Sequence, residues 1–294
     1  MNIQSLSICV PAKNCINDCR FCCSKMHNAD YEERFSDISG FSDFSDDMRK
    51  RLEYARENGC NTCMLTGNNE PQQNKAFLRV FGEINKSLRM PFHNIEMQTT
   101  GAFIDSDMLD FLQRSIGVTT VAISVACLDN DGFNREMICT KDDRLTLETL
   151  CREIKTRNMN LRICLNMNDA ILADHPFTPD SVIALCSAFG ADQITFRALW
   201  APNADSAQGK WIAQNVTEKT QSFIRALKAS IKENGRYLDT LEYGADRYDY
   251  FGFSVVIDED CMSHGVNKTA VKYLILRPNG HLYSKWDSKA SLIF

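Results

Sequence analysis

Hydrophobic and polar positions follow two different periods along the first 200 residues. Short apolar runs of strand length alternate with longer stretches in which apolar residues recur every three or four positions. The short runs predict strands at residues 6–10, 62–66, 94–99, 118–125, 160–166 and 193–198. The longer stretches predict helices at residues 48–58, 73–88, 105–115, 145–157 and 180–189. Strands that alternate with helices in this way favour a parallel sheet covered by crossover helices.

Six strand–helix units predict an α/β fold, a partial (βα)6 TIM-like barrel in which the working groups follow the strands. In the fifth predicted strand the apolar residues occupy one face and the polar residues the other, namely Leu161, Ile163 and Leu165 against Arg162, Cys164, Asn166 and Asn168. The interior of an ordinary barrel is filled with branched apolar side chains. A polar interior therefore predicts a binding cavity.

The pattern changes after residue 200. A loop is expected at residues 201–209, an amphipathic helix at 217–234 with Thr217 as its N-cap, and a hairpin turn at residues 278–280. We therefore predict a barrel at residues 1–200 and a C-terminal α+β extension at 201–294, which covers the barrel opening. Five aromatic residues of the extension are expected either to wall the substrate cavity or to pack a small terminal layer: Tyr243, Tyr248, Tyr250, Phe251 and Phe253.

Composition narrows the class of protein. Apolar residues make up 44% and charged residues 24%, and no apolar run is long enough to span a membrane. The start of the chain lacks the pattern of a secretory signal. A net charge of −5 makes a nucleic-acid partner unlikely, because phosphate backbones attract basic surfaces. The odd number of cysteines, 13, and their scatter predict a reducing, cytoplasmic environment.

Three of these cysteines lie within eight residues, Cys15, Cys19 and Cys22. Thiolates at such spacing can be aimed at one metal site by a short loop. Three ligands are one fewer than a closed zinc site or a 4Fe–4S cluster held entirely by protein requires. The pattern therefore predicts either a metal centre with an open position or a zinc-stabilised binding module whose fourth ligand is Cys23 or His27. Cys23 itself is not expected to bind a cluster, because adjacent side chains point in different directions.

This spacing, with an aromatic residue before the third cysteine, resembles the cluster motif of the radical S-adenosylmethionine (SAM) superfamily. The resemblance implies that Cys15, Cys19 and Cys22 hold a 4Fe–4S cluster whose remaining iron binds SAM. In that family one electron from the cluster cleaves SAM to a 5′-deoxyadenosyl radical, which removes a hydrogen atom from the substrate. Only Cys261 lies beyond Cys186, too few for a second protein-held cluster, so we predict one cluster per chain.

Further residues match the family more loosely. The segment Gly67, Asn68, Asn69, Glu70 and Pro71 resembles the Gly-Gly-Glu-Pro motif that contacts the SAM amino group, with Asn68 in place of a glycine and Asn69 inserted. The resemblance also implies SAM contacts from residues after later strands, namely Thr99, Ser124, Arg135 and Asn166. A surface ion pair is the alternative role for Arg135. Cys127 is a candidate hydrogen-atom donor, although a buried packing role is more typical of cysteine.

The layout is similar to that of compact superfamily members such as viperin and the molybdopterin-precursor synthase, which act on nucleotides. This likeness implies an oxygen-sensitive enzyme that acts on a small-molecule or nucleotide-like substrate and receives electrons from a donor such as flavodoxin or ferredoxin. Arg197 is expected either to meet an anionic substrate or to form a structural ion pair. Modification of a ribosomally made peptide and activation of a glycyl-radical enzyme are the alternative activities.

Overall fold

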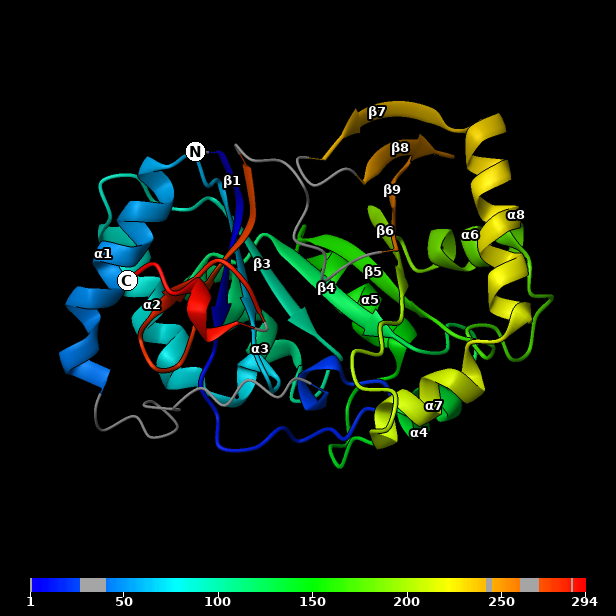
Figure 1. Ribbon diagram of the computed structural model, residues 1–294, viewed down its shortest axis with the longest axis horizontal. Helices are drawn as coiled ribbons and strands as arrows, with labels where there is room; N and C mark the ends of the chain where they lie inside the picture. The colour runs from blue at the N-terminus through cyan, green and yellow to red at the C-terminus, as the bar shows by residue number, and fades with distance from the viewer. Residues whose placement is uncertain (1, 27–40, 242–244, 260–269, 287) are drawn as a thin grey trace.

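The computed structural model describes residues 2–26, 41–241, 245–259, 270–286 and 288–294 (Figure 1). Six parallel strands lie side by side in sequence order, as the pattern predicted: β1 (Asn2–Cys9), β2 (Thr62–Thr66), β3 (Asn94–Thr99), β4 (Thr120–Val125), β5 (Asn160–Met167) and β6 (Gln193–Ala198). The predicted α/β barrel architecture is thus confirmed.

The C-terminal part extends both edges of this sheet. Strand β10 (Ala270–Leu276) pairs in parallel with β1, and β9 (Phe253–Asp258) pairs in parallel with β6. Antiparallel strands follow at each edge, β11 (Leu282–Tyr283) beside β10, and β8 (Asp246–Tyr250) and β7 (Arg236–Thr240) beyond β9. The predicted hairpin joins β10 to β11. The division at residue 200 stays a prediction, since strands on both sides of it share one sheet.

Helices connect the strands and cover the outer face of the sheet (Figure 1). The predicted helices are α1 (Phe41–Glu57), α2 (Lys75–Ser87), α3 (Ser106–Asp110) with a π-helical turn Phe111–Ile116, α5 (Leu147–Thr156), α6 (Pro179–Ala188) and α8 (Glu218–Asn234). Thr217 caps α8, since its side chain accepts a hydrogen bond from the backbone N–H of Lys219. Short 3₁₀ turns occur at Cys23–Lys25, Pro71–Gln73 and Lys289–Ser291.

Two short helices were missed from sequence, α4 (Asp131–Ile138) and α7 (Ala207–Asn215). The first turn of α7 overlaps the predicted loop at 201–209, because Ser206 begins the helix by accepting a hydrogen bond from the backbone N–H of Gly209 at 2.9 Å. Helices of two to three turns have little periodicity, and turn-forming residues precede both of them.

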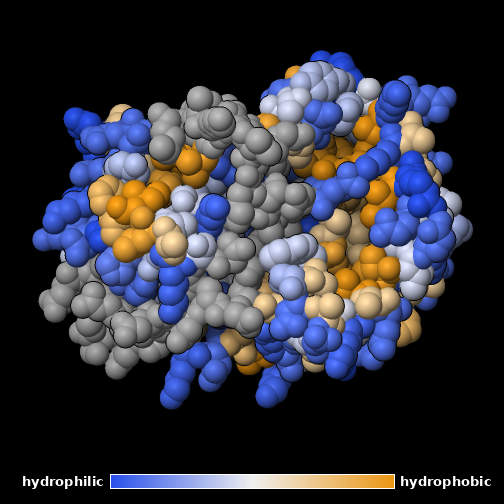
Figure 2. Space-filling model, viewed as in Figure 1, coloured by the Kyte–Doolittle hydropathy of each residue, from blue (hydrophilic) through white to orange (hydrophobic). Residues whose placement is uncertain are grey.

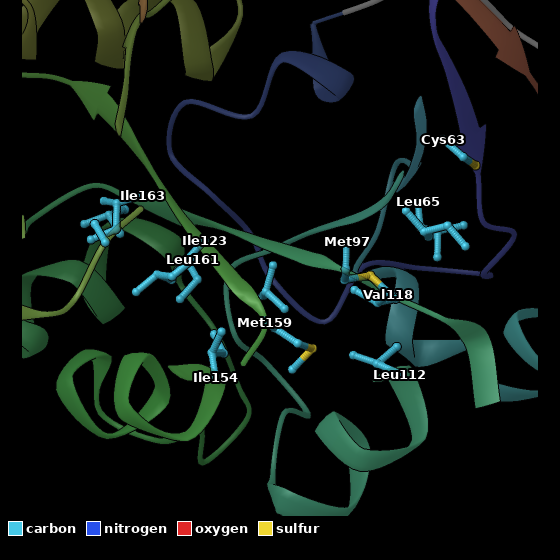
Figure 3. Close-up of a cluster of buried hydrophobic side chains, with 14 of the residues drawn as sticks. Cys63, Leu65, Met97, Leu112, Val118, Ile123, Ile154, Met159, Leu161 and Ile163 are labelled. Atoms are coloured by element: carbon cyan, nitrogen blue, oxygen red, sulfur yellow. The ribbon is translucent and has the colours of Figure 1, made fainter. Parts of the chain in front are cut away.

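The main core lies between the sheet and these helices. Strand residues such as Leu65, Met97, Ile123 and Ile163 lie close to the helix residues Leu112 and Ile154 (Figure 3), and all six are fully buried. Each such side chain contributes roughly 1.5–3 kcal/mol through burial. This layer holds the strand ends in fixed positions, so that the residues that follow them form a stable rim.

The sheet curls so that its two flanking parallel strands approach each other. The Nζ atom of Lys272 on β10 lies 4.0 Å from Oδ1 of Asp258 on β9, although these strands stand at opposite ends of the series of eight parallel strands. No backbone pairing joins β9 to β10 within the described ranges, so the barrel is open on this side. None of the described helices has the length and apolar character needed to cross a membrane.

Candidate active site

A cavity of about 290 Å³ lies at the carboxyl ends of the parallel strands. Most of the residues predicted from sequence line it together, namely Cys15, Cys19, Cys22, Gly67, Asn68, Asn69, Glu70, Thr99, Ser124 and Asn166. These residues come from loops that are far apart in the sequence but follow neighbouring strands. The barrel topology therefore brings the predicted groups to one place.

The cysteine loop follows β1 and is fastened to α4. The backbone N–H of Asp18 donates to the carbonyl of Ile138 at 3.1 Å, and that of Arg20 donates to the carbonyl of Met137 at 2.9 Å. The aromatic residue before the third cysteine, Phe21, packs against a tryptophan of α7 with ring centres 5.8 Å apart. These contacts hold the loop across the mouth of the cavity.

The pKa values of two of the three thiols, Cys15 and Cys19, are raised. Burial is the main cause that raises the pKa of Cys19 well above its usual value, and the neighbouring charges of Cys22 and Glu70 raise it further. Burial likewise raises the pKa of Cys15, with Glu70 and Cys22 adding to the effect. Bound cations would relieve this repulsion and displace the thiol protons. The donor set therefore fits a metal cluster.

The zinc alternative needs a fourth ligand, Cys23 or His27, beside the three thiols. No group of three or more His, Cys, Asp or Glu side chains is placed to hold one metal ion in the part of the chain that the structure describes. The proposed fourth zinc ligand His27 lies outside the described residues, and Cys23 is exposed at the cavity wall. A 4Fe–4S cluster binds each thiolate on a separate iron, so its ligands need not converge on one point.

Glu70 connects three of the loops that line the cavity. Its Oε1 accepts a hydrogen bond from Asn17 Nδ2 at 2.8 Å, and its Oε2 accepts from Gln72 Nε2 at 2.9 Å and Thr99 Oγ1 at 2.5 Å. The backbone N–H of Thr100 donates to the same carboxylate at 3.1 Å. Burial raises the pKa of Glu70, while these hydrogen bonds act in the opposite direction. The loops after β1, β2 and β3 are thereby tied together.

Sequence reasoning named Thr99 but missed two other partners of Glu70, Asn17 and Gln72. Asn17 lies between two cluster cysteines, but an asparagine in a loop gives no distinctive pattern. Its Oδ1 and that of Asn69 are buried at the cavity and have no hydrogen-bond partner among the described residues. Oxygen acceptors beside a carboxylate suit an ammonium group, such as the amino group of SAM. The residues present thus fit SAM as well as the cluster.

Gly67 allows the β2 loop to approach β1 closely. A Cβ atom at this position would lie 3.1 Å from the carbonyl oxygen of Val10 and 3.3 Å from its nitrogen. Asn69 Nδ2 donates to the same carbonyl at 2.9 Å. A side chain at position 67 would therefore push the loop away from the strand.

Two predicted residues are not brought to the cavity. Arg135 lies on α4, where its Nε donates to Asp131 Oδ2 at 2.8 Å and its Nη2 to the carbonyl of Arg144 at 2.5 Å. Cys127 is buried and lies 3.4 Å from Asp129 Oδ1, and burial raises the pKa of Cys127 to about 11. Neither side chain is among those that line the cavity. The SAM contact of Arg135 and the hydrogen-donor role of Cys127 therefore stay predictions, which the cavity lining does not support.

Arg144 is a buried cation that sequence reasoning did not find. Its side chain is 0% exposed, and its Nη2 lies 3.5 Å from Asp131 Oδ1. The Nη1 atom of this guanidinium would lie 3.8 Å from a Cβ built on Gly101, in the loop after β3. A polar stretch without periodicity surrounds Arg144 in the sequence, so nothing there indicates burial.

The remaining wall of the cavity comes mainly from the C-terminal part. Its residues include Arg197 on β6, Trp200 just after that strand, and Asp258, Tyr273, Arg277 and Trp286 from the last forty residues. We call this wall the tail half and the wall formed by the cysteine, β2 and β3 loops the cofactor half. Residues of the C-terminal part thus belong to the cavity wall, while an extension at 201–294 that covers the barrel opening stays a prediction.

The aromatic residues that contribute are not the predicted ones. None of the four described members of the predicted set lies in the cavity wall. Tyr248 packs against Tyr237 with ring centres 5.9 Å apart, and Tyr250 Oη lies 2.6 Å from Ser230 Oγ. Tyr243 and Cys261 lie outside the described residues. The aromatic cluster instead helps to join the β7–β8 ribbon to α8, which stands beside it in Figure 1.

Comparisons with known proteins identify the family of the chain. The model of the radical SAM superfamily matches residues 9–171, more than half of the chain. The sequence has no match among curated proteins. Two similar solved structures are Streptococcus suis SuiB bound to S-adenosylmethionine and native anSMEcpe with bound AdoMet.

The likeness to both structures is one of fold. SuiB shares 13% identity at a TM-score of 0.56 over 96% of this chain, which spans only 58% of SuiB. The second structure shares 15% identity at a TM-score of 0.62, over 99% of this chain and 77% of its own. Together with the superfamily match, the cavity and its three thiols lead to one conclusion. The chain belongs to the radical SAM superfamily, whose enzymes use a 4Fe–4S cluster and SAM.

Proposed function

We propose that this enzyme abstracts a hydrogen atom from a small-molecule or nucleotide-like substrate that lies in the tail half of the cavity. The observation that carries the proposal is the division of one cavity into two unlike halves. One half gathers the residues that match the superfamily motifs, and the other gathers arginine, aspartate and aromatic side chains that no motif requires. Two halves of one cavity suit a cofactor and a substrate held side by side.

The cofactor half has defined tasks in this proposal. Cys15, Cys19 and Cys22 hold the cluster, which when bound supplies the electron for reductive cleavage of SAM. The SAM molecule lies against residues that already line this half: Gly67, Asn68, Asn69, Glu70, Thr99, Ser124 and Asn166.

The residues of the chain position these groups and exclude water. Glu70 fixes the loops after β1, β2 and β3 through its hydrogen bonds, so the thiols and the acceptors for the ammonium keep their relative places. Asn166 is buried and donates to the carbonyl of Val125 at 3.2 Å, which holds its side chain at the rim. Preorganised groups in a site closed to water are the contribution of the protein to radical chemistry.

The cellular setting is part of the proposal. No disulfide joins any two of the 12 cysteines that the structure describes, which supports a reducing, cytoplasmic environment. An exposed iron of the cluster implies sensitivity to oxygen, and its reduction implies an electron donor such as flavodoxin or ferredoxin. Each of these points follows from the cofactor rather than from a separate feature of the chain.

The proposal is tested with anaerobically reconstituted enzyme, SAM and a strong reductant. Release of 5′-deoxyadenosine is expected, and its rate should rise when a correct substrate is added from a panel of nucleotides and small metabolites. Substrate labelled with deuterium at the reacting carbon should transfer the label to 5′-deoxyadenosine. A protein loaded with iron and reduced that never cleaves SAM would contradict the proposal.

A further inference from the structure

Three residues within the first strands form a floor of the cavity, namely Ser7 on β1, Met64 on β2 and Gln98 on β3. Each precedes the last residue of its strand, so it lies deeper in the barrel than the loops that follow the strands. Ser7 is the register neighbour of Met64 on one side and of Ile275 on β10 on the other. The floor therefore reaches from beneath the cofactor half toward the tail half, and its three side chains are uncharged.

The side-chain amide of Gln98 is held in one orientation. Its Nε2 donates to Glu96 Oε1 at 3.0 Å and to Met64 Sδ at 3.5 Å. The Glu96 side chain is 4% exposed and forms an ion pair with Arg162, whose Nε donates to Gln193 Oε1 at 2.7 Å. A carboxylate paired with a guanidinium only accepts hydrogen bonds, so the amide nitrogen of Gln98 must face Glu96. The amide oxygen therefore points away from this carboxylate.

The floor has hydrogen-bonding capacity that the protein does not use. Within the described part of the chain Gln98 Oε1 makes no hydrogen bond, and Ser7 Oγ is fully buried and has no partner either. Hydrophilic side chains cover most of the face in Figure 2, where water can satisfy them. Gln98 is half-buried in a partly enclosed cavity, where a hydrogen bond is stronger than in water. A ligand that supplies the missing donor would therefore be bound firmly.

We propose that Gln98 binds an uncharged amide or imide group of the substrate by accepting a hydrogen bond from its N–H, and that Ser7 contacts a second polar atom of the same group. Because Glu96 fixes the amide of Gln98, this side chain selects against groups that present only acceptors. An ammonium group also carries donors, but the uncharged floor does not offset the cost of its desolvation. This inference rests on the proposed function and names the chemical class of its substrate.

Fluorine NMR, which detects weak binding of small molecules, tests the inference on the holoenzyme. Protein with its cluster, saturated with SAM and kept without reductant, is titrated anaerobically with trifluoroacetamide and with its N-methyl and N,N-dimethyl derivatives. All three are uncharged and carry the same trifluoromethyl reporter, but the dimethyl form has no N–H. We expect the first two to bind with affinities within about threefold of each other, and the dimethyl form to bind at least about tenfold more weakly. Trifluoroethylammonium, which is charged, should also bind about tenfold more weakly than trifluoroacetamide.

Four variants assign the preference to the floor. Q98M keeps the size of the side chain but removes its oxygen, so trifluoroacetamide should lose about tenfold in affinity and its advantage over the dimethyl form should disappear. E96Q tests the positioning role of Glu96, because a second amide lets that of Gln98 turn over, and the advantage should shrink. S7A should weaken amide binding about threefold without lowering the melting temperature, since the hydroxyl has no partner to lose. Q221M is the matched control, an exposed position on α8, and its affinities should equal those of the unmodified protein.

Preference for amides with an N–H that is lost in Q98M and kept in Q221M supports the inference. Equal affinity for trifluoroacetamide and its dimethyl form, tighter binding of trifluoroethylammonium, or no saturable binding of any amide overturns it. Loss of amide binding on addition of SAM also overturns it, because the floor would then belong to the cofactor. The comparison of the amides needs no variant, so a variant that fails to fold does not affect it. Release of 5′-deoxyadenosine is measured separately: SAM cleavage without amide preference contradicts this inference alone, and amide preference without SAM cleavage contradicts the proposed function alone.

Discussion

The two halves of the cavity are built in different ways. The cofactor half consists of loops that follow successive strands and are joined by hydrogen bonds around one buried carboxylate, that of Glu70. The tail half depends on strands added at opposite edges of the sheet, which meet through the ion pair of Lys272 and Asp258. The cofactor half needs only neighbouring strands and their loops, whereas the tail half forms only when the whole sheet has curled. Changes in the two halves should therefore have separable consequences.

The largest expected effect concerns the cysteines of the cofactor half. Replacement of Cys15, Cys19 and Cys22 by alanine should abolish cluster binding and SAM cleavage, because thiolates hold the iron. Absorbance near roughly 400 nm after anaerobic reconstitution, which reports sulfide-to-iron charge transfer, measures the loss. Cys139→Ala is the control, since this half-buried thiol does not line the cavity. A triple variant that stays brown, and so still binds a cluster, would show that other residues hold it.

The next effect concerns Glu70. Glu70→Ala removes the acceptor of the Thr99 hydroxyl and of the Thr100 backbone N–H, and each buried donor left without a partner costs about 1–3 kcal/mol. The side-chain amides of Asn17 and Gln72 lose one acceptor each but keep another. We expect the free energy of unfolding to fall by about 3 kcal/mol or more and SAM affinity to fall at least tenfold. Urea denaturation and equilibrium binding of SAM measure the two quantities. Glu233→Ala on the exposed side of α8 should change stability by less than about 0.5 kcal/mol. If the two variants lost equal amounts of stability and of SAM affinity, the hydrogen bonds of Glu70 would not be what holds the cofactor half together.

The same contrast explains what the sequence could predict. Every strand of the first six and the three cluster cysteines follow from local patterns, because strand periodicity and cysteine spacing are properties of neighbouring residues. The gathering of Gly67, Glu70 and Thr99 at one cavity then follows from barrel topology. Asn17 and Arg144 could not be found, because burial of a loop amide or of a guanidinium depends on contacts between distant segments.

The tail half was harder to predict for the same reason. The aromatic residues between 243 and 253 are dense in the sequence, yet their described members pack around α8 and the β7–β8 ribbon. Tyr273 and Trp286 are isolated in the sequence but line the cavity, because β10 joins the sheet beside β1. Local density of a residue type indicates a cluster, and the sheet order decides where that cluster lies.

A moderate effect is expected from the ion pair that joins the edges of the sheet. The side chains of Lys272 and Asp258 are 4% and 10% exposed, so Lys272→Met leaves a carboxylate poorly compensated. The free energy of unfolding should fall by about 1–3 kcal/mol, less than for a fully isolated charge because Arg197 is a register neighbour of Asp258. Lys228→Met breaks an exposed pair with Glu259 and should cost about 0.5 kcal/mol at most. Chemical denaturation of both variants gives the comparison, and equal costs would show that the buried pair does not hold the tail half.

The smallest effect is expected from a change at Arg135, which lies on α4 beside the cofactor half. Arg135→Gln removes an ion pair whose members are 32% and 26% exposed, so stability should fall by only about 0.5–1 kcal/mol. Asp131 keeps other partners, since its Oδ1 accepts from the backbone N–H of Leu147 at 3.2 Å and lies 3.5 Å from Arg144 Nη2. SAM affinity should stay within about twofold of the unmodified protein, because Arg135 does not line the cavity. Equilibrium binding of SAM to the reconstituted variant measures this, and a tenfold loss would return Arg135 to the role that the superfamily resemblance implied.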